Sequence, residues 1–432
     1  MKIEELIKAT GAIVLDNNLN KNLNVTISTD TRTIKSGDFY LPLKGASFDG
    51  ENFIEQAIDK GAVGAFCTKQ GGSLKVNDTL EAYLKLANYR RNKLNFKVVA
   101  ITGSSGKTTT KELIAAVLQE KFKTFKTPLN HNNEIGFCQT IFEAPDDTEV
   151  LVLEMGMRGL GEIELLSKYS EPDITVISNV GTAHIGRLGS RENIAKAKCE
   201  IVKYQRGKVF IAHDDDLIKN TINFNGEKIY YSVKDTEIIE KSEKYSKFIY
   251  QNNIYELNVS GNFNIENALA AINVGLKLGM EVNQIQNGLK KYFPLEKRWE
   301  AVNAGGYEII NDSYNANPES MRAFIDTILE LYDNYTIILG DMGELGENEV
   351  FYHAELGKYI NNHQKLNNNS VIISIGSLSA NITNNIDKIK TYHYTDIDEA
   401  VDFIKNNISK ENKIFLKASR SMKFEQIIEK LV

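Results

Sequence analysis

The chain has 432 residues, 42% hydrophobic and 25% charged, with 51 basic and 57 acidic side chains. This composition is ordinary for a globular protein, and the length suits about three domains. A net charge of −6 disfavours a protein that coats nucleic acid, because phosphate binding requires a basic surface.

Cysteine spacing and apolar runs narrow the class of protein further. Cys67, Cys138 and Cys199 lie far apart without a Cys-x-x-Cys pair, so we expect neither a zinc knuckle nor a secreted disulfide framework. Acidic residues interrupt the first apolar stretch, unlike in a signal peptide, and no run of about 18 apolar residues is present. We therefore predict a cytoplasmic protein with no membrane span and no nucleic-acid partner. We also expect a monomer.

Short β-branched runs alternate with longer amphipathic runs, which is typical of an α/β protein. Buried strands are predicted, in chain order, over residues 98–102, 150–154, 174–178, 307–310, 336–339, 371–375 and 413–417. Helices are predicted over residues 111–121, 163–169, 265–278, 318–332 and 351–361. Polar junctions at 89–97 and 293–299 predict three domains, over residues 1–96, 97–297 and 298–432.

The strongest local signal directly follows the first of these strands, where residues 98–110 read VVAITGSSGKTTT. An apolar strand enters a turn containing Gly103 and Gly106, and Lys107 and Thr108 follow the turn before the predicted helix. Glycines let backbone N–H groups surround phosphate oxygens, and a helix N-terminus favours an anion. Lys107 would neutralise the β- and γ-phosphates of a nucleotide, and Thr108 would offer its hydroxyl to Mg²⁺.

This loop departs from the standard G-x-x-x-x-G-K-[ST] pattern, because Ile101 stands where the first glycine belongs. The alternative interpretation is a turn rich in serine and glycine that binds no ligand. The order of strand, loop and helix, together with the Lys-Thr pair, favours the phosphate loop.

Three further residues lie beyond the loop. Glu154 ends a predicted strand and could offer Mg²⁺ an oxygen in the crevice at the carboxyl edge of the sheet, or could be solvated. His184 lies in a loop with flanking glycines after the strand at 174–178, where a structural histidine is the alternative. Lys198 lies on a predicted helix over residues 194–200, and the pattern alone predicts a solvated lysine there.

Together these segments resemble the Mur ligases, ATP-dependent amide ligases of bacterial cell-wall synthesis. The family's shortened phosphate loop, T-G-x-x-G-K-T-x-T, matches residues 102–110 and accounts for Ile101. The strand end at 153–156, the loop at 179–186 and the position of Lys198 are similar as well. The resemblance covers essentially the whole chain.

The resemblance implies a substrate for the first two domains. Residues 28–32 and 37–45 look like the family's UDP-binding module, and residues 130–136 (NHNNEIG) look like its substrate loop. The implied substrate-binding residues are Thr31, Arg32, Gly45, Asn130, Asn132 and Asn133. Residues 261–268 look like the adenine-side motif, although Phe263 stands where histidine is usual.

In the last domain, residues 311–318 (NDSYNANP) and 339–346 (LGDMGELG) look like the family member that adds a dipeptide. That member joins D-alanyl-D-alanine to UDP-N-acetylmuramoyl-tripeptide, which implies that Asn315 and Asn317 lie near the substrate. Ala418 replaces a common glycine in the closing segment. A Mur-type ligase with a different amino acid acceptor stays an alternative, as does a nucleotide-binding switch that makes no amide.

The resemblance also implies the reaction's cofactors and catalytic residues. ATP would be used with two Mg²⁺ ions, one held by Thr108 and Glu154 and the other by His184 and Lys198. An ammonium group has no lone pair for a metal, and the family resolves this by carbamylating the lysine with CO₂. Lys107, His184 and Lys198 are the implied catalytic residues. The implied ATP-binding residues are Gly103, Ser104, Ser105, Gly106, Lys107, Thr108, Thr109, Asn267, Arg298 and Asp312.

The implied fold has three α/β domains. They are an N-terminal UDP-binding module, a central domain like a P-loop ATPase with a mostly parallel sheet, and a Rossmann-like C-terminal domain. Because the implied ATP and acceptor contacts are divided between the last two domains, the third domain is expected to close on the second and exclude water.

Overall fold

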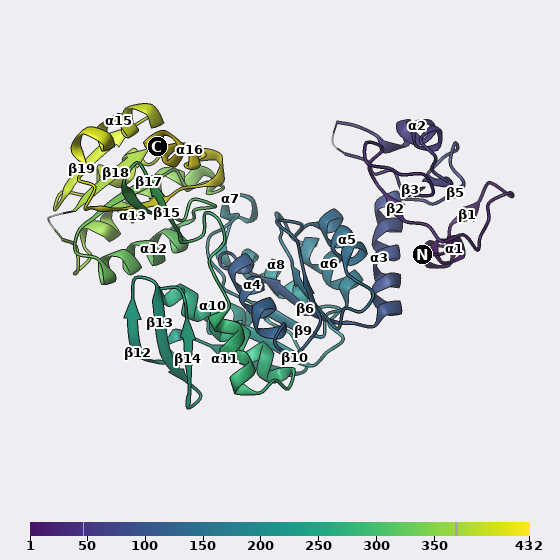
Figure 1. Cartoon of the computed structure of the whole chain (residues 1–432), viewed down its shortest axis with the longest axis horizontal. Coiled ribbons are helices and arrows are strands. Elements are labelled where there is room, and N and C mark those ends of the chain that lie inside the picture. The colour runs from purple at the N-terminus through teal and green to yellow at the C-terminus, as the bar shows by residue number, and fades with distance from the viewer. Residues whose placement is uncertain (46, 368–369) are drawn as a thin grey trace.

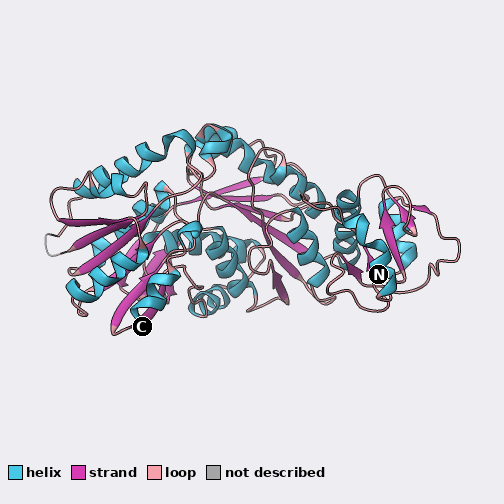
Figure 2. Cartoon of the chain, turned by 90° about the horizontal axis from the view of Figure 1, so that it is seen from above, coloured by secondary structure: helices cyan, strands magenta, loops and turns pink. Residues whose placement is uncertain are grey.

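The computed structural model describes residues 1–45, 47–367 and 370–432. These residues form an elongated molecule, with the N-terminal segment at one end, a central sheet in the middle and the C-terminal segment at the other end (Figure 1). Figure 2 shows the same arrangement of the three parts from above, with the two termini at opposite ends of the molecule. No helix in the described ranges is long and apolar enough to cross a membrane.

The N-terminal unit contains a sheet of five short strands in the order β1-β5-β4-β3-β2. Its strands are β1 (Ile13–Val14), β2 (Ile27–Ser28), β3 (Phe39–Tyr40), β4 (Gly64–Cys67) and β5 (Leu74–Lys75), and its helices are α1 (Ile3–Thr10) and α2 (Ile54–Asp59). Phe39 and Phe66 meet edge to face in its core, with ring centroids 5.3 Å apart. The sequence pattern did not predict these strands, because runs this short show no clear alternation.

The central sheet has six parallel strands in the order β11-β10-β9-β6-β8-β7. They are β6 (Lys97–Thr102), β7 (Thr124–Lys126), β8 (Val150–Glu154), β9 (Ile174–Ile177), β10 (Val209–His213) and β11 (Glu227–Tyr231). Alternate residues of β6 enter different cores: Val99 and Ile101 face one, and Val98 and Ala100 face the other. Both faces are therefore covered, as a parallel sheet requires.

Helices cover both faces of the central sheet. One core contains residues of α4 (Lys107–Leu118), α10 (Asn262–Lys277) and α11 (Val282–Lys290). The other contains residues of α3 (Thr79–Leu94), α5 (Glu134–Glu143), α6 (Glu162–Ser170) and α8 (Arg191–Cys199), and continues into the N-terminal unit. The shorter helices α7 (Ile185–Leu188) and α9 (Asp216–Thr221) follow β9 and β10.

An antiparallel sheet of three strands follows the central sheet, and it was not predicted. Its strands are β12 (Glu237–Ser242), β13 (Tyr245–Tyr250) and β14 (Asn253–Leu257). Phe248 and Tyr255 extend from it into the core that contains α10. The sequence pattern did not predict β12, because five of its six residues are exposed and it lacks the alternation of a half-buried strand.

The C-terminal sheet has the order β15-β16-β20-β17-β18-β19, with only β15 antiparallel to its neighbour. Its strands are β15 (Glu300–Ala304), β16 (Tyr307–Asn311), β17 (Tyr335–Gly340), β18 (Val371–Ile375), β19 (Lys390–Tyr394) and β20 (Lys413–Lys417). Its helices are α12 (Pro318–Leu331), α13 (Glu349–Asn361), α14 (Ala380–Thr383), α15 (Ile397–Asn407) and α16 (Glu425–Leu431). The predicted α/β fold class is confirmed.

Every strand and helix predicted for these regions is present, and the differences lie at the ends. The largest shift is at the phosphate loop, where the helix predicted over 111–121 spans Lys107–Leu118. This helix starts early because Gly106, at φ 75°, turns the backbone directly into it. The predicted domain boundaries near residues 96 and 297 fall between sheets, and the three-domain division stays a prediction.

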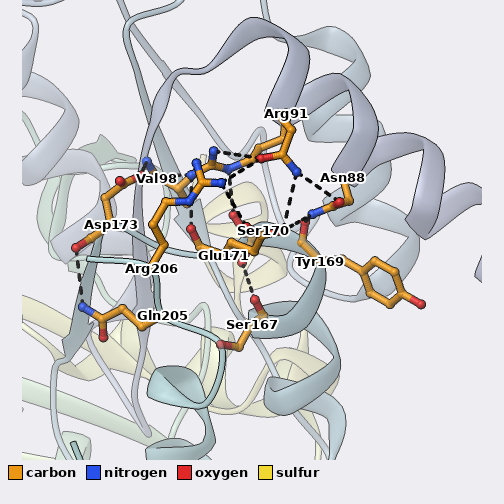
Figure 3. A network of polar contacts seen from close by, with 11 residues as sticks. Asn88, Arg91, Val98, Ser167, Tyr169, Ser170, Glu171, Asp173, Gln205 and Arg206 are labelled. Atoms are coloured by element: carbon orange, nitrogen blue, oxygen red, sulfur yellow. Dashed lines mark hydrogen bonds and ion pairs between the residues drawn. The ribbon is translucent and has the colours of Figure 1, made fainter. Parts of the chain in front are cut away.

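Helix α3 is attached to the central unit by a buried polar network (Figure 3). The side chain of Arg91 is fully buried and donates to the carbonyls of Ser170 at 3.0 Å and Glu171 at 3.1 Å. It also pairs with Asp173 at 3.1 Å, and the same carboxylate oxygen accepts the backbone N–H of Val98 at 2.8 Å. The network thus joins the helix to the start of β6.

Replacing Arg91 with alanine is expected to lower the free energy of unfolding by about 3 kcal/mol, because breaking a buried pair leaves Asp173 without its partner. Arg206→Ala is the matched control, since Arg206 pairs with Glu171 in the same network but is 42% exposed. It is expected to cost about 1 kcal/mol or less. Urea unfolding measures both variants, and equal losses would contradict the assignment of Arg91 as the buried anchor.

Candidate active site

A cavity of about 890 Å³ opens at the carboxyl edge of the central sheet and is also lined by the C-terminal unit. Parallel strands end at one edge, so the loops after β6, β8 and β9 meet there. The cavity brings together most of the predicted site residues: Ser104, Ser105, Gly106, Lys107, Thr108, Thr109, Asn130, Asn132, Asn133, Glu154, His184, Asn267, Arg298, Asp312, Asn315 and Asn317.

Five predicted residues do not line this cavity. Gly103 lies inside the phosphate loop, and Lys198 is buried. Thr31, Arg32 and Gly45 belong to the N-terminal unit, at the far end of the molecule (Figure 1). The side chain of Arg32 is 87% exposed and pairs with Asp30 at 2.6 Å, which lowers the pKa of Asp30 to about 2.

The phosphate loop is packed so closely that a side chain at either of its glycines would clash with a neighbouring side chain. A Cβ on Gly103 would lie 1.9 Å from Ser178 Oγ, and one on Gly106 would lie 2.6 Å from Asn267 Oδ1. Lys107 folds back so that its ammonium donates to the carbonyl of Gly103 at 2.8 Å. Burial lowers the pKa of Lys107. The charge of Arg298 lowers this pKa further, whereas the carboxylate of Glu154 raises it.

Thr108 and Glu154 offer oxygen atoms to a cation at this edge. Arg298 donates to Thr108 Oγ1 at 3.0 Å, and Asn132 donates to Glu154 Oε1 at 3.0 Å. Glu154 is 3% exposed, and its Oε2 has no hydrogen-bond partner within the described residues. Lys111 Nζ lies 3.7 Å from that oxygen. A buried carboxylate oxygen without a hydrogen bond, in the same cavity as the Thr108 hydroxyl and the phosphate loop, suits Mg²⁺, which takes oxygen ligands and substrate phosphates.

His184 connects the central unit to the C-terminal unit. Its backbone has φ 67°, and its Nδ1 lies 2.6 Å from Oε2 of Glu344. This contact lowers the pKa of Glu344. Glu344 belongs to the segment 339–346 that resembles the family member adding a dipeptide, and sequence reasoning did not anticipate its contact with His184.

Lys198 is not the solvated lysine that the helical pattern predicts. It is 1% exposed on α8, and its ammonium makes no hydrogen bond or ion pair with the residues that the structure describes. Burial, aided by Lys107, holds the pKa of Lys198 well below its usual value. The pattern misleads because α8 is covered on the face that carries Ile194 and Lys198.

The predicted adenosine-side residues Asn267, Arg298 and Asp312 line the same cavity. Thr110 donates to Asn267 Oδ1 at 3.0 Å, and Lys417 pairs with Asp312 at 2.6 Å. Arg298 lies over the ring of Tyr314, 4.0 Å from its centroid.

Phe263, the residue that replaces the usual histidine, packs edge to face on Trp299 with centroids 5.6 Å apart. Trp299 in turn contacts Phe324 of the C-terminal unit. Sequence reasoning missed Trp299, although it is the only tryptophan of the chain.

A buried histidine holds the loop that carries Glu344. His353 Nε2 accepts the backbone N–H of Met342 at 2.9 Å, and its Nδ1 lies 2.7 Å from the carbonyl of Glu349. This arrangement requires the neutral ring with the proton on Nδ1. Burial accordingly lowers the pKa of His353.

Acidification is therefore expected to destabilise the fold through His353. Its pKa is lower in the folded state, so its stabilising contribution is present above the unfolded pKa and is lost as pH falls through the folded pKa. Urea unfolding between about pH 7 and pH 5 should show a steeper loss of stability for the natural protein than for His353→Gln, because glutamine keeps an acceptor but does not titrate. Parallel curves for the two proteins would contradict this expectation.

Three family models match the chain. They are the Mur ligase family catalytic domain over residues 25–94, the Mur ligase middle domain over 101–275 and the Mur ligase glutamate ligase domain over 297–420. The chain belongs to the Mur ligase family, and the resemblance seen in its motifs is confirmed.

Two curated relatives are named UDP-N-acetylmuramoyl-tripeptide–D-alanyl-D-alanine ligase. That of Bacillus subtilis is 36% identical and covers 94% of this chain and 93% of its own length, and that of Haemophilus influenzae is 33% identical with the same coverages. A crystal structure of MurF from Acinetobacter baumannii superposes with a TM-score of 0.89 at 28% identity, covering 100% of this chain and 98% of that one. MurF from Thermotoga maritima in complex with ADP superposes with a TM-score of 0.84 at 27% identity, covering 96% and 98%.

Proposed function

We propose that this chain is an ATP-dependent ligase that joins D-alanyl-D-alanine to UDP-N-acetylmuramoyl-tripeptide in peptidoglycan precursor synthesis. One observation carries the proposal: a single cavity is lined both by the phosphate loop and by the C-terminal loop of residues 311–318, which could receive an acceptor. Relatives with this activity in their name, similar over nearly the whole chain, support the choice of substrates. The predicted cytoplasmic location and monomeric state fit this role and remain to be tested.

The chemistry follows from the difficulty of joining a carboxylate to an amine in water. The tripeptide carboxylate attacks the γ-phosphorus of ATP and forms an acyl phosphate and ADP. The amine of the dipeptide then adds to the acyl carbon, and the tetrahedral intermediate expels phosphate to leave the amide. The protein's part is to position the groups and stabilise developing charge. Lys107 is suited to the transferring phosphoryl group because its ammonium lies in the phosphate loop.

Magnesium suits the residues at this edge of the sheet. Thr108 and Glu154 would hold one ion, and His184 with a carbamylated Lys198 would hold a second. Mg²⁺ supplies charge neutralisation to phosphate oxygens when it is bound. The low pKa of Lys198 supports the carbamate, because only the neutral amine reacts with CO₂.

The UDP substrate is assigned to the N-terminal unit, with Thr31, Arg32 and Gly45 among its contacts. Arg32→Ala is expected to raise the KM for the UDP substrate roughly tenfold while kcat stays unchanged, because a remote contact contributes uniform binding. Steady-state kinetics at saturating ATP measure this. A fall in kcat at constant KM would place Arg32 in the chemical step instead.

One assay tests the function and both alternatives. Purified protein receives ATP, Mg²⁺ and UDP-N-acetylmuramoyl-tripeptide, with D-alanyl-D-alanine or with single amino acids. Phosphate release is recorded together with the mass of the product. The proposal expects an amide product only with the dipeptide. A product with a single amino acid would indicate a ligase with a different acceptor, and nucleotide hydrolysis without any amide would indicate a switch.

A further inference from the structure

The loop of residues 180–186, here called the His184 loop, lies between the central and C-terminal units. It follows β9 and includes the first two residues of α7. Two glutamates of the C-terminal unit bind it. One contact is Glu344, whose backbone carbonyl accepts the N–H of Gly186 at 3.1 Å. The other is Glu319, which has no role in the reaction described so far.

Glu319 binds the His184 loop with one carboxylate oxygen. Its Oε2 accepts the backbone N–H of Thr182 at 3.0 Å and the hydroxyl of the same residue at 2.8 Å. Thr182 is 5% exposed, so these donors are sheltered from water. A Cβ on Gly181 would lie 2.7 Å from the same oxygen, so the absence of a side chain there lets Glu319 approach.

The backbone that carries Glu319 is fixed at the start of α12. Pro318 is the first residue of this helix, and the side chain of Asn317 caps it by accepting the N–H of Ser320 at 2.9 Å. Glu319 lines the same cavity as the phosphate loop and His184. The carboxylate is therefore held by a rigid element of one unit and aimed at a loop of the other, two residues before His184.

We propose that Glu319 is a positioning residue, which fixes the His184 loop when the C-terminal unit is seated against the central unit. Movement of the C-terminal unit away would remove the acceptor from both Thr182 donors at once. The placement of His184 would then depend on the arrangement of the two units. The expected effect on turnover rests on the proposed ligase function.

Two variants of Glu319 separate positioning from simple packing. Glu319→Ala removes the acceptor, and Glu319→Gln keeps one oxygen that can accept both donors. Glu319→Ala is expected to lower kcat roughly 10- to 100-fold, because misplaced groups cost that much. The KM for ATP should change by less than about threefold. Glu319→Gln is expected to recover most of the lost turnover.

Glu330→Ala is the matched control. Glu330 lies on the same helix and pairs with Lys241 at 2.7 Å, so it also joins α12 to the part of the chain before residue 297. It does not line the cavity. This variant tests whether the loss of any ion pair between these units lowers kcat. We expect its kcat to stay within about twofold of that of the natural protein.

Hydrogen–deuterium exchange of the ligand-free protein supplies a measurement that does not depend on activity. Glu319→Ala should accelerate exchange in the peptide that contains residues 180–186, and Glu330→Ala should not. Gly181→Ala tests the same contact from the other side, because the added Cβ would displace the carboxylate of Glu319. It should reproduce both effects, and adding Glu319→Ala to it should cause little further loss.

Unchanged exchange in a folded Glu319→Ala protein would overturn the proposal. An equal fall in kcat for Glu330→Ala would also overturn it. Thermal unfolding checks the fold of each variant, and if Glu319→Ala does not fold, Glu319→Gln and Gly181→Ala decide the question by the same measurements. If the natural protein makes no amide while exchange responds as expected, the ligase function fails and the role of Glu319 in holding the loop stands.

Discussion

Lys107→Ala is expected to lower the rate of amide formation on the order of 10³-fold while the fold stays intact. The ammonium of Lys107 lies in the phosphate loop at the edge of the cavity, where it donates to the carbonyl of Gly103 and to no other described residue. Negative charge develops on the phosphoryl group during transfer, and a cation positioned there stabilises the transition state more than the bound ATP. The loss should therefore fall on turnover rather than on the binding of ATP.

Phosphate release and product mass measure this effect, and urea unfolding checks the fold. Lys121→Ala is a suitable control, because Lys121 follows the far end of α4 and donates to the carbonyl of Gly279, outside the cavity. It removes a positive charge of the same kind near the same helix. A folded Lys107→Ala protein that forms product at close to the natural rate would remove Lys107 from the phosphoryl-transfer step.

The parts of the fold that the sequence predicted are those with a local physical cause. Strands of a parallel sheet are buried on both faces, so β8 and β20 read as continuous apolar runs with clear ends. The phosphate loop is equally local, since its glycines, lysine and threonine are adjacent in the chain. The loop could be placed because the apolar run of β6 directly precedes it in the sequence.

Other features depend on contacts between distant residues. Glu319 and Thr182 are 137 positions apart, and neither side chain shows in the sequence that it has the other as a partner. The burial of Lys198 is set by how α8 packs, which a helical pattern with two lysines does not reveal. Lys198 was predicted only through the family resemblance, and the structure adds that its side chain is buried and that burial lowers its pKa.

Lys198→Ala is expected to lower ligation on the order of 10²- to 10³-fold, because it would remove the proposed ligand of the second Mg²⁺ ion. The same reasoning predicts that Lys198 is carbamylated in the working enzyme. An ammonium would repel Mg²⁺, whereas a carbamate presents an anionic oxygen that suits it. The buried side chain meets the chemical requirement, since its lowered pKa leaves more of the neutral amine to attack CO₂ and release a proton.

Two measurements test this assignment. Short carboxylic acids should restore part of the activity of Lys198→Ala, because a carboxylate can fill the gap and supply the missing oxygen. Protein prepared with ¹³C-labelled bicarbonate should show a carbamate carbon signal that Lys198→Ala lacks. Lys196→Ala is the matched control, since Lys196 lies on the same helix but is exposed, and it should keep both the signal and the activity. A fully active, Mg²⁺-loaded enzyme without the carbamate signal would contradict the assignment, and His184 would then need another partner to hold a second ion.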